Sequence, residues 1–522
     1  MSGLRIPRRR FLQAGAAMVC APYLSRAADR PEVTHGVQSG DVSGEGAVVW
    51  SRTDRPSLMQ VEWSTTESFR EIGGAMRLAA GLETDFTAKA MLTNLPTGQD
   101  IFYRVRFLNA SEPNVGSAIV TGRFRTPSSA SRDITFLWTG DTAGQGWGID
   151  LDRGGMRGYE IMRRNRPDFF IHSGDTVYAD NAILPEQKMP GSGIWKNVVL
   201  EEKAKAAETL SEFRASFKYN LMDSNVLAFN AEVPGYYQWD DHEVTDNWWP
   251  DQPLNLPDHR ARKYTETNIR PLVARANRAF HEFLPVQPAT GDPARIYRKV
   301  GYGPSLDLFF LDMRSYRAAN GDNRQATYGP DAHCLGPQQI AWLKRELKAS
   351  RATWKVIAAD QPISLYVADD WRKQSGSEAI AQNDHGAPLG RELEIADILS
   401  FMKREKISNT VWLTADVHYT AAHYYNPDKA AFQDFEPFWE FVSGPIHSGT
   451  FGPNPLDGTF GPELKFIKAP TKEQGVNLPP SAGLQFFGHV KIDGKSEAMT
   501  VTLKDIGDAP LWSVVLEPRR TP

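Results

Sequence analysis

Acidic residues follow apolar, strand-like runs at four separate places in this sequence. The most acidic of these ends is Asp240-Asp241-His242-Glu243, after the apolar run Val233–Trp239. The others close the segments Leu137–Gln145 (LWTGDTAGQ), Phe169–Asn181 (FFIHSGDTVYADN) and Thr410–Tyr419 (TVWLTADVHY). Charged groups at the end of a buried strand lose hydration, which costs free energy unless a counter-charge is present. A metal ion would provide that charge, so the pattern predicts a metal site assembled from distant parts of the chain.

The donor types at these strand ends indicate which metals would bind. Carboxylate, imidazole and phenol groups suit hard or borderline cations such as ferric iron, zinc, manganese or calcium, rather than a soft thiolate site. Tyr178 lies three residues after Asp175, and a loop directly after a strand can turn both side chains inward. A phenolate ligand favours ferric iron, because only a strongly acidic metal holds tyrosine deprotonated well below its free pKa of about 10. Asp416 and His418 would share one face if both were still in regular strand.

Two neighbouring cations in such a site would support hydrolysis of a phosphate ester. A carboxylate bridges ions about 3.5–4 Å apart, a bound water becomes hydroxide near neutral pH, and both ions neutralise the phosphate oxygens. His242 follows the candidate ligand Asp241 and is placed to protonate the leaving alkoxide or to hold the transition-state phosphate. The sequence therefore predicts a two-metal phosphoesterase.

Each motif also has a purely structural interpretation when it is considered alone. Gly140-Asp141 could form a turn and Tyr178 could pack in the core. Residues 240–243 could form an acidic surface turn, and Asp416 with His418 could be a satisfied buried pair. The joint occurrence of all four motifs favours the metal site.

Composition sets the broad class of the protein. With 522 residues the chain exceeds the usual size of one domain, which predicts two domains. Its hydrophobic content of 41% is enough for a large core. The formal charge is only -4, from 59 basic and 63 acidic residues, so no polyanion-binding surface is predicted and nucleic acid is not an expected partner.

The pattern of elements divides the chain near residue 130. Residues 32–126 contain short alternating strands, such as Gly46–Ser51 and Asp100–Phe107, separated by turn residues, which predicts a β-sandwich accessory domain. From Asp133 onward strands alternate with helices, which predicts an α/β catalytic domain over residues 133–522. Helices are expected over Gly155–Asn165, Leu200–Phe217, Lys263–Phe283, Gly336–Ala349 and Glu392–Lys406.

The first 27 residues have the features of a twin-arginine signal peptide. Arg8-Arg9-Arg10 precedes the weakly apolar run Ala14–Tyr23 and the small-residue site Ser25-Arg26-Ala27. The apolar run is too short to anchor the chain in a bilayer, so no membrane anchor is expected in the mature form. We therefore expect the twin-arginine translocase as a partner during export and a periplasmic or secreted location. Of the two cysteines one leaves with this segment, so Cys334 is expected to be unpaired.

Taken together, the motifs resemble the alkaline phosphatase D (PhoD) family of metallophosphoesterases. The resemblance rests on GDTAGQG, SGDTVYADN, WDDHEVTDNW, TADVHY, the helix LGPQQIAWLKREL and the twin-arginine signal, and it covers nearly the whole chain. It implies an Ig/fibronectin-like N-terminal domain before a calcineurin-like αββα-sandwich. It also implies hydrolysis of phosphomonoesters and often of phosphodiesters, with a small phosphate ester as substrate. The same motifs are similar to those of purple acid phosphatases.

The resemblance also implies roles for individual residues. The first, iron-like metal would be bound by Asp141, Asp175, Tyr178 and His418, with Asp175 bridging to the second. Asp241 and Asp416 would serve the second metal, Ca²⁺, Zn²⁺ or Mn²⁺, and His242 would be the acid or phosphate-binding residue. Many family members have Cys after the first strand where this chain has Asp141, so the identity of the second metal stays open. The purple acid phosphatase histidine between the third and last motifs has no equivalent, and Gln361 stands there as a weak polar contact.

Other polar residues are expected to have supporting roles. Glu243 is a candidate to orient either His242 or a ligand, and Asn181 and Asn247 are candidates to orient ligands. His172 is expected either to support a ligand or to lie in the core, and His423 is expected to be structural. His447, in a Gly-rich loop, is a candidate for the edge of the pocket.

The sequence is also compatible with two rival functions. One is a phospholipase D-like or nucleotide-directed phosphodiesterase on the same scaffold, and the other is a non-catalytic exported binding protein.

Overall fold

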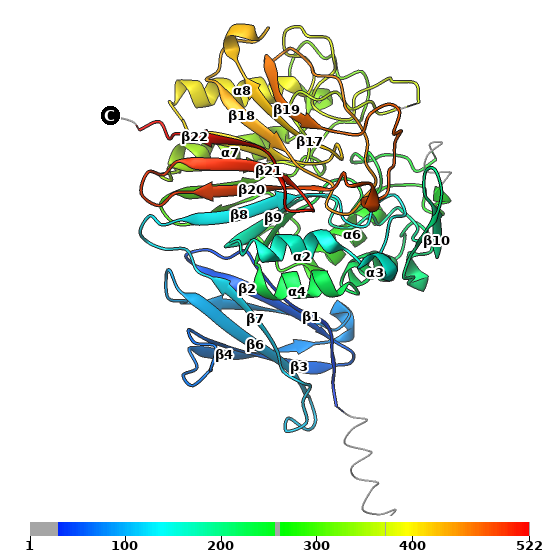
Figure 1. The fold of residues 1–522 in the computed structure, drawn as a ribbon, viewed down its shortest axis with the longest axis vertical. Helices are drawn as coiled ribbons and strands as arrows, with labels where there is room; N and C mark the ends of the chain where they lie inside the picture. The colour runs from blue at the N-terminus through cyan, green and yellow to red at the C-terminus, as the bar shows by residue number, and fades with distance from the viewer. Residues whose placement is uncertain (1–29, 256–261, 371, 521–522) are drawn as a thin grey trace, which may run out of the picture.

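Two β-sheets lie face to face, with helices on both outer sides and a small β-domain at one end (Figure 1). This computed structural model describes residues 30–255, 262–370 and 372–520. The predicted signal peptide, residues 1–27, lies outside the described residues. No helix in the described ranges is long and apolar enough to cross a bilayer.

The larger sheet has nine strands in the described part of the chain. In spatial order they are β22 (Pro510–Leu516), β21 (Met499–Asp505), β20 (Phe486–Ile492), β8 (Ile134–Thr139), β9 (Phe169–Ser173), β12 (Gly235–Gln238), β1 (Val33–Gly40), β2 (Gly46–Thr53) and β5 (Thr87–Thr93). The central strands β8, β9 and β12 run parallel, so their carboxyl ends lie at one edge of the sheet.

The second sheet has seven strands among the described residues. Their order is β13 (Arg298–Gly301), β14 (Leu306–Phe310), β15 (Trp354–Ala358), β16 (Thr410–Thr414), β18 (Phe438–Val442), β17 (Thr420–Tyr425) and β19 (Pro462–Lys468). β14, β15, β16 and β18 are parallel to one another. A short hairpin, β10 (Glu186–Lys188) with β11 (Ile194–Lys196), stands apart from both sheets.

Burial on both faces explains why the central strands are nearly continuous apolar runs. Every residue of β9 and of β14 is buried, as expected for parallel strands covered on two sides. One hydrophobic cluster fills the space between the sheets and includes Trp138, Phe310 and Phe441. The outer face of the nine-stranded sheet carries α2 (Arg157–Arg164), α3 (Leu210–Asn220), α4 (Ser224–Glu232) and α6 (Arg270–Phe283). The seven-stranded sheet carries α7 (Gly336–Ala349) and α8 (Glu392–Arg404). The predicted αββα sandwich is confirmed.

The N-terminal β-domain is joined to the larger sheet. Its second sheet has the order β4 (Gly74–Ala80), β3 (Ser57–Ser64), β6 (Asp100–Asn109) and β7 (Val120–Arg125), and packs on β1, β2 and β5. β1 meets β12 at the single pair Gly40↔Gly235. A Cβ on Gly40 would lie 2.5 Å from the carbonyl oxygen of Gly235, so only glycine allows this approach. The ion pair between Arg298 and Asp41, at 2.6 Å, ties the domain to the catalytic sheets at the same place.

Two of the expected helices begin later than their periodicity indicated. The helix expected from Leu200 begins at Leu210, because Thr209 and Glu212 form a capping box there. The helix expected from Lys263 begins at Arg270, with Pro271 in its first turn. A capping box therefore marks the first boundary, whereas the second helix has no side-chain cap and starts with proline in its first turn.

Candidate functional site

The acidic strand ends of both sheets meet at one place. Asp141 follows β8, Asp175 follows β9 and Asp241 follows β12, all at the carboxyl edge of the larger sheet. Asp416 follows β16 and reaches the same place from the smaller sheet. Parallel strands present their carboxyl ends together, so two packed parallel sheets bring four distant segments to a shared edge.

The backbone leaves strand geometry at these residues. The φ angle is 68° at Asp141, 53° at Asp175, and 62° at both Asp416 and His418. Left-handed backbone is uncommon for residues other than glycine, although Asp tolerates it best, and each case costs on the order of 1–3 kcal/mol. Asp416 and His418 are therefore not at successive strand positions on one face. Sharp turns bring both residues to the edge where the strands end.

The first donor set contains Asp141, Asp175 and His418, whose ligand atoms lie within 4.8 Å of one another. The Tyr178 hydroxyl is 3.0 Å from Asp141 Oδ1 and 3.0 Å from His418 Nε2. His418 Nδ1 must donate to the Gly449 carbonyl, which leaves the Nε2 lone pair directed to the set. Burial lowers the pKa of His418 to about 4, so the imidazole is neutral, as a metal ligand has to be.

The second and third donor sets continue from the first. Asp175, Asp241 and His242 form the second, and Asp240, Asp241 and Asp416 form the third, with the same 4.8 Å limit on the ligand atoms. Asp175 belongs to the first two sets and Asp241 to the last two. Such shared carboxylates can bridge neighbouring cations.

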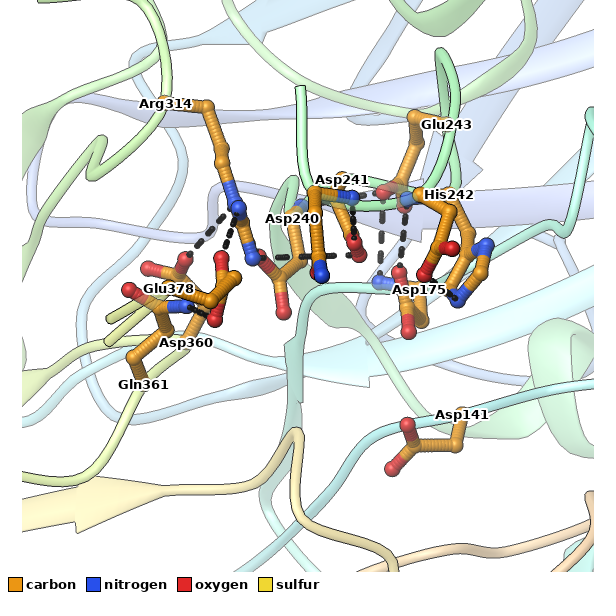
Figure 2. A network of polar contacts seen from close by, with 12 residues as sticks. Asp141, Asp175, Asp240, Asp241, His242, Glu243, Arg314, Asp360, Gln361 and Glu378 are labelled. Atoms are coloured by element: carbon orange, nitrogen blue, oxygen red, sulfur yellow. Dashed lines mark hydrogen bonds and ion pairs between the residues drawn. The ribbon is translucent and has the colours of Figure 1, made fainter. Parts of the chain in front are cut away.

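Glu243 holds together two of the loops that carry candidate ligands (Figure 2). Its carboxylate accepts hydrogen bonds from the backbone N–H groups of Asp175 at 3.2 Å, Thr176 at 2.6 Å and Asp240 at 2.9 Å. It also accepts the Thr176 hydroxyl, at 2.7 Å. Glu243 therefore positions the backbone beside the candidate ligands, rather than contacting His242 as one of the sequence-based alternatives had it.

His242 lies between an aromatic ring and a buried carboxylate. Its ring stacks on Tyr178 with centroids 4.1 Å apart, and its Nδ1 lies 2.8 Å from Asp180 Oδ1. Burial alone would lower the pKa of His242, but the carboxylates of Asp180 and Asp241 raise it to about 10. Asp180 also forms an ion pair with Arg262, whose Nε lies 3.0 Å from Asp180 Oδ2. In the metal-free chain His242 is therefore protonated and can donate from Nε2, so of the second donor set only Asp175 and Asp241 are free to bind a cation.

Asp180 was missed in the sequence, although it lies only two residues after Tyr178 in the same motif. Asp240 was also not assigned as a ligand, although it directly precedes Asp241. Asp360 was overlooked as well; it follows β15 as the other acids follow their strands, and both of its oxygens are buried without a hydrogen-bond partner. The signal that found the other acids, a carboxylate after a buried strand, applies to Asp360 too.

The donor sets have the chemistry that a cation requires. Asp141 Oδ2 and Asp240 Oδ2 are buried and make no hydrogen bond within the described part of the chain. Burial raises the pKa of Asp141 well above its ordinary value, and burial together with the neighbouring Asp241 does the same for Asp175. Burial raises the pKa of Asp241 to about 6. Acids this close together are stable as carboxylates only beside positive charge, so the residues fit a metal cluster.

The remaining polar candidates lie around this cluster. His172 is buried and its Nε2 contacts the Thr142 hydroxyl at 2.9 Å. His447 is also buried, with Nε2 3.0 Å from the Gly148 carbonyl, so it lies in the core rather than at an open edge. The Asn247 backbone donates to Asp241 Oδ2 at 2.6 Å. The Asn181 side chain accepts from the Gln145 backbone at 2.9 Å, and Gln361 donates to Glu378.

Comparisons with known proteins identify the family of this chain. The PhoD-like phosphatase family matches residues 136–503, and the N-terminal domain of PhoD-like phosphatases matches residues 18–128. Alkaline phosphatase D of Bacillus subtilis (strain 168) is 26% identical over 443 residues, 80% of this chain and 70% of the relative.

Two solved structures share the fold. A structure of PhoD superimposes with a TM-score of 0.66 at 18% identity, covering 93% of this chain and 89% of the other. The purple acid phosphatase PPD1 from yellow lupin (Lupinus luteus) gives a TM-score of 0.57 at 12% identity, covering 94% and 74%. At these identities the two structures support the fold, and the family match over most of the chain supports the chemistry. The chain belongs to the PhoD-like phosphatase family and is a phosphoric ester hydrolase.

Proposed function

We propose that this protein is an exported, metal-dependent alkaline phosphatase that hydrolyses phosphomonoesters and extends to phosphodiesters. The observation that carries the proposal is the chain of three overlapping donor sets, linked by Asp175 and Asp241. Structural acidic clusters pair with Lys or Arg. Here Asp141, Asp175 and Asp416 make no ion pair with Lys or Arg in the described ranges, so cations from solution are the expected partners.

Specific residues would hold the cations. Asp141, Asp175, Tyr178 and His418 would bind the first, and Asp241 and Asp416 the second, with Asp175 between them. Bound metal ions supply an activated water and positive charge for the phosphate oxygens. The phenol of Tyr178 donates to Asp141 at 3.0 Å in this structure, and burial raises the pKa of Tyr178 well above its ordinary value. Only a strongly acidic ion such as Fe³⁺ would displace that proton, and the second cation would be Ca²⁺, Zn²⁺ or Mn²⁺.

His242 supplies the proton for the leaving group. Its Nδ1 is occupied by Asp180, so its protonated Nε2 is the nitrogen available to a substrate oxygen. General acid catalysis of this kind contributes about 10²–10⁴-fold to a rate. Glu243 keeps the backbones of Asp175 and Asp240 in place while the proton moves.

Export is proposed from the N-terminal segment. Residues 1–27 would be a twin-arginine signal, and the mature protein, in the periplasm or outside the cell, would carry a β-sandwich over 32–126 and the catalytic domain over 133–522. The substrate would be a small phosphate ester, and the mature form would have no membrane anchor.

The test uses the mature protein on p-nitrophenyl phosphate and bis-p-nitrophenyl phosphate, with and without chelator. We expect monoester hydrolysis that chelator abolishes and that added metal restores. Asp175→Asn should remove activity and metal together, while Asp331→Asn, a matched change at an exposed acid, should alter neither. Activity on neither substrate in the metal-loaded protein would contradict the proposal, and activity on the diester alone would favour a phosphodiesterase.

A further inference from the structure

Arg314 is a fully buried arginine at the edge of the third donor set (Figure 2). Its guanidinium donates to Asp240 Oδ1 at 2.5 Å and lies 3.8 Å from Asp241 Oδ1. It is also 3.8 Å from Asp360 Oδ2. One fixed positive charge therefore faces three carboxylates on this side, two of which, Asp240 and Asp241, belong to the third donor set.

A second acid holds this guanidinium in place from the other side. Arg314 donates to the Glu378 carboxylate, which also accepts from Arg317 at 3.0 Å and from Gln361. Burial would raise the pKa of Glu378, but the guanidinium groups of Arg314, Arg317 and Arg391 lower it to about 2, so this acid stays ionised. Arg317 also contributes positive charge to Glu378. The charge of Arg314 is therefore not fully compensated by Glu378 and also acts on Asp240.

The distribution of charge around the third donor set follows from these contacts. Asp240 is paired with Arg314, whereas the described residues offer Asp416 no ion-pair partner. Without the guanidinium, Asp240, Asp360 and Asp416 would have no Lys or Arg within ion-pair distance in the described ranges, and Asp241 would face only the imidazolium of His242. The number of charged ligands tunes the affinity of oxygen-rich sites for hard cations. Such a group would attract more positive charge than one divalent ion supplies.

We propose that Arg314 is a positioning residue that serves as a built-in counter-ion, holding Asp240 and excluding an additional cation from the space between Asp240 and Asp360. Arg314 thereby limits the number of cations that bind beside Asp241 and Asp416. This inference rests on the proposed metal dependence.

The test measures metal content and affinity, which are separate from turnover. Mature protein is stripped with chelator, equilibrated with Ca²⁺, and its bound calcium counted by elemental analysis; Tb³⁺ titration gives the affinity. Arg314→Met should bind one more Ca²⁺ per chain, or bind Tb³⁺ at least about tenfold more tightly, since removing a unit charge a few ångströms away at protein-like permittivity changes affinity by more than that factor. Arg314→Lys should retain the wild-type count.

Further variants separate this role from a general structural one. Arg317→Met removes a guanidinium from the same network that contacts Glu378 but not Asp240, and should leave the metal count unchanged. Asp240→Asn combined with Arg314→Met should restore the wild-type count, because both charges are then removed. Arg314→Gln removes the charge but keeps a polar side chain, and the same two measurements on this variant decide the question if Arg314→Met does not fold.

The outcomes distinguish this inference from the proposed function. If the wild-type protein binds metal and Arg314→Met binds the same number with the same affinity, Arg314 is not a counter-ion. A loss of metal in Arg314→Met that the double variant does not reverse also overturns the proposal. If the wild-type protein binds no metal at all, the proposed function itself fails, and this result is read before any variant is compared.

Discussion

Replacing Asp180 by Asn would remove the carboxylate that keeps His242 protonated. The Asp180 Oδ1 lies 2.8 Å from His242 Nδ1, and the pKa of His242 is about 10 in its presence, although burial opposes the charge. An amide in the same place still accepts or donates a hydrogen bond but carries no charge. The pKa of His242 should then fall toward or below its ordinary value of about 6.5.

The size of the effect depends on pH. At pH 8 an imidazole with a pKa of about 10 is almost fully protonated, whereas one with a pKa of about 6.5 is protonated to about 3%. We therefore expect kcat of Asp180→Asn to be about thirtyfold lower at pH 8 and within about twofold of the wild type at pH 6. Cations bound nearby lower the pKa of His242 in both the wild type and Asp180→Asn. The quantity to compare is therefore the difference in pH between the basic limbs of the two kcat profiles.

The assay is a pH profile of kcat on p-nitrophenyl phosphate from pH 5.5 to 9.5. Asp246→Asn is the matched control, because Asp246 Oδ1 is 3.8 Å from Nε2 and its side chain is 37% exposed, so its basic limb should move less. Arg262 loses one of its two carboxylate partners in Asp180→Asn, and removing one partner of a buried pair costs about 3–5 kcal/mol. Thermal unfolding should therefore accompany the kinetics. A profile lowered equally at every pH would refute the proton-donor role of His242.

Four other predictions follow from the same structure. His242→Ala should lower kcat by about 10²–10⁴-fold with the metal content retained, and loss of metal would instead place His242 among the ligands. Tyr178→Phe should abolish a visible charge-transfer band and reduce bound iron, and a colourless, iron-free wild type would contradict that ligation. The metal-free protein should lose stability in urea unfolding as the pH rises from 6.5 to 8. Burial raises the pKa of Glu243 to about 7. The pKa of His242 would be lowered by burial, but the neighbouring carboxylates raise it to about 10. Both values exceed those of the unfolded chain, so the folded chain holds extra protons and loses about 1.4 kcal/mol per proton and pH unit, and bound metal should flatten this slope. Gly40→Ala should cost about 1–3 kcal/mol in thermal unfolding, because its Cβ would lie 2.5 Å from the Gly235 carbonyl oxygen, whereas Gly44→Ala, in open space, should cost far less.

The sequence alone determined the architecture and where the chemistry had to be. Parallel strands covered on two faces are nearly continuous apolar runs, so β9 and β14 could be predicted from composition. A carboxylate directly after such a run is costly to bury without a counter-charge, which made Asp141, Asp175 and Asp241 visible as candidates. These features depend on residues close together in the chain, which is why a single sequence was sufficient.

The tertiary structure decided how the charges are compensated. Arg314 contacts Asp240 from 74 residues away and Glu378 from 64, and no local pattern specifies either contact. The same holds for Asp180, whose partners His242 and Arg262 come from a later part of the chain. A charge can be neutralised by any opposite charge that folding brings near it, and electrostatic energy depends on distance in space rather than along the chain. The acids could be found in the sequence, but only the fold shows which of them pair with an arginine and which have no such partner in the described ranges.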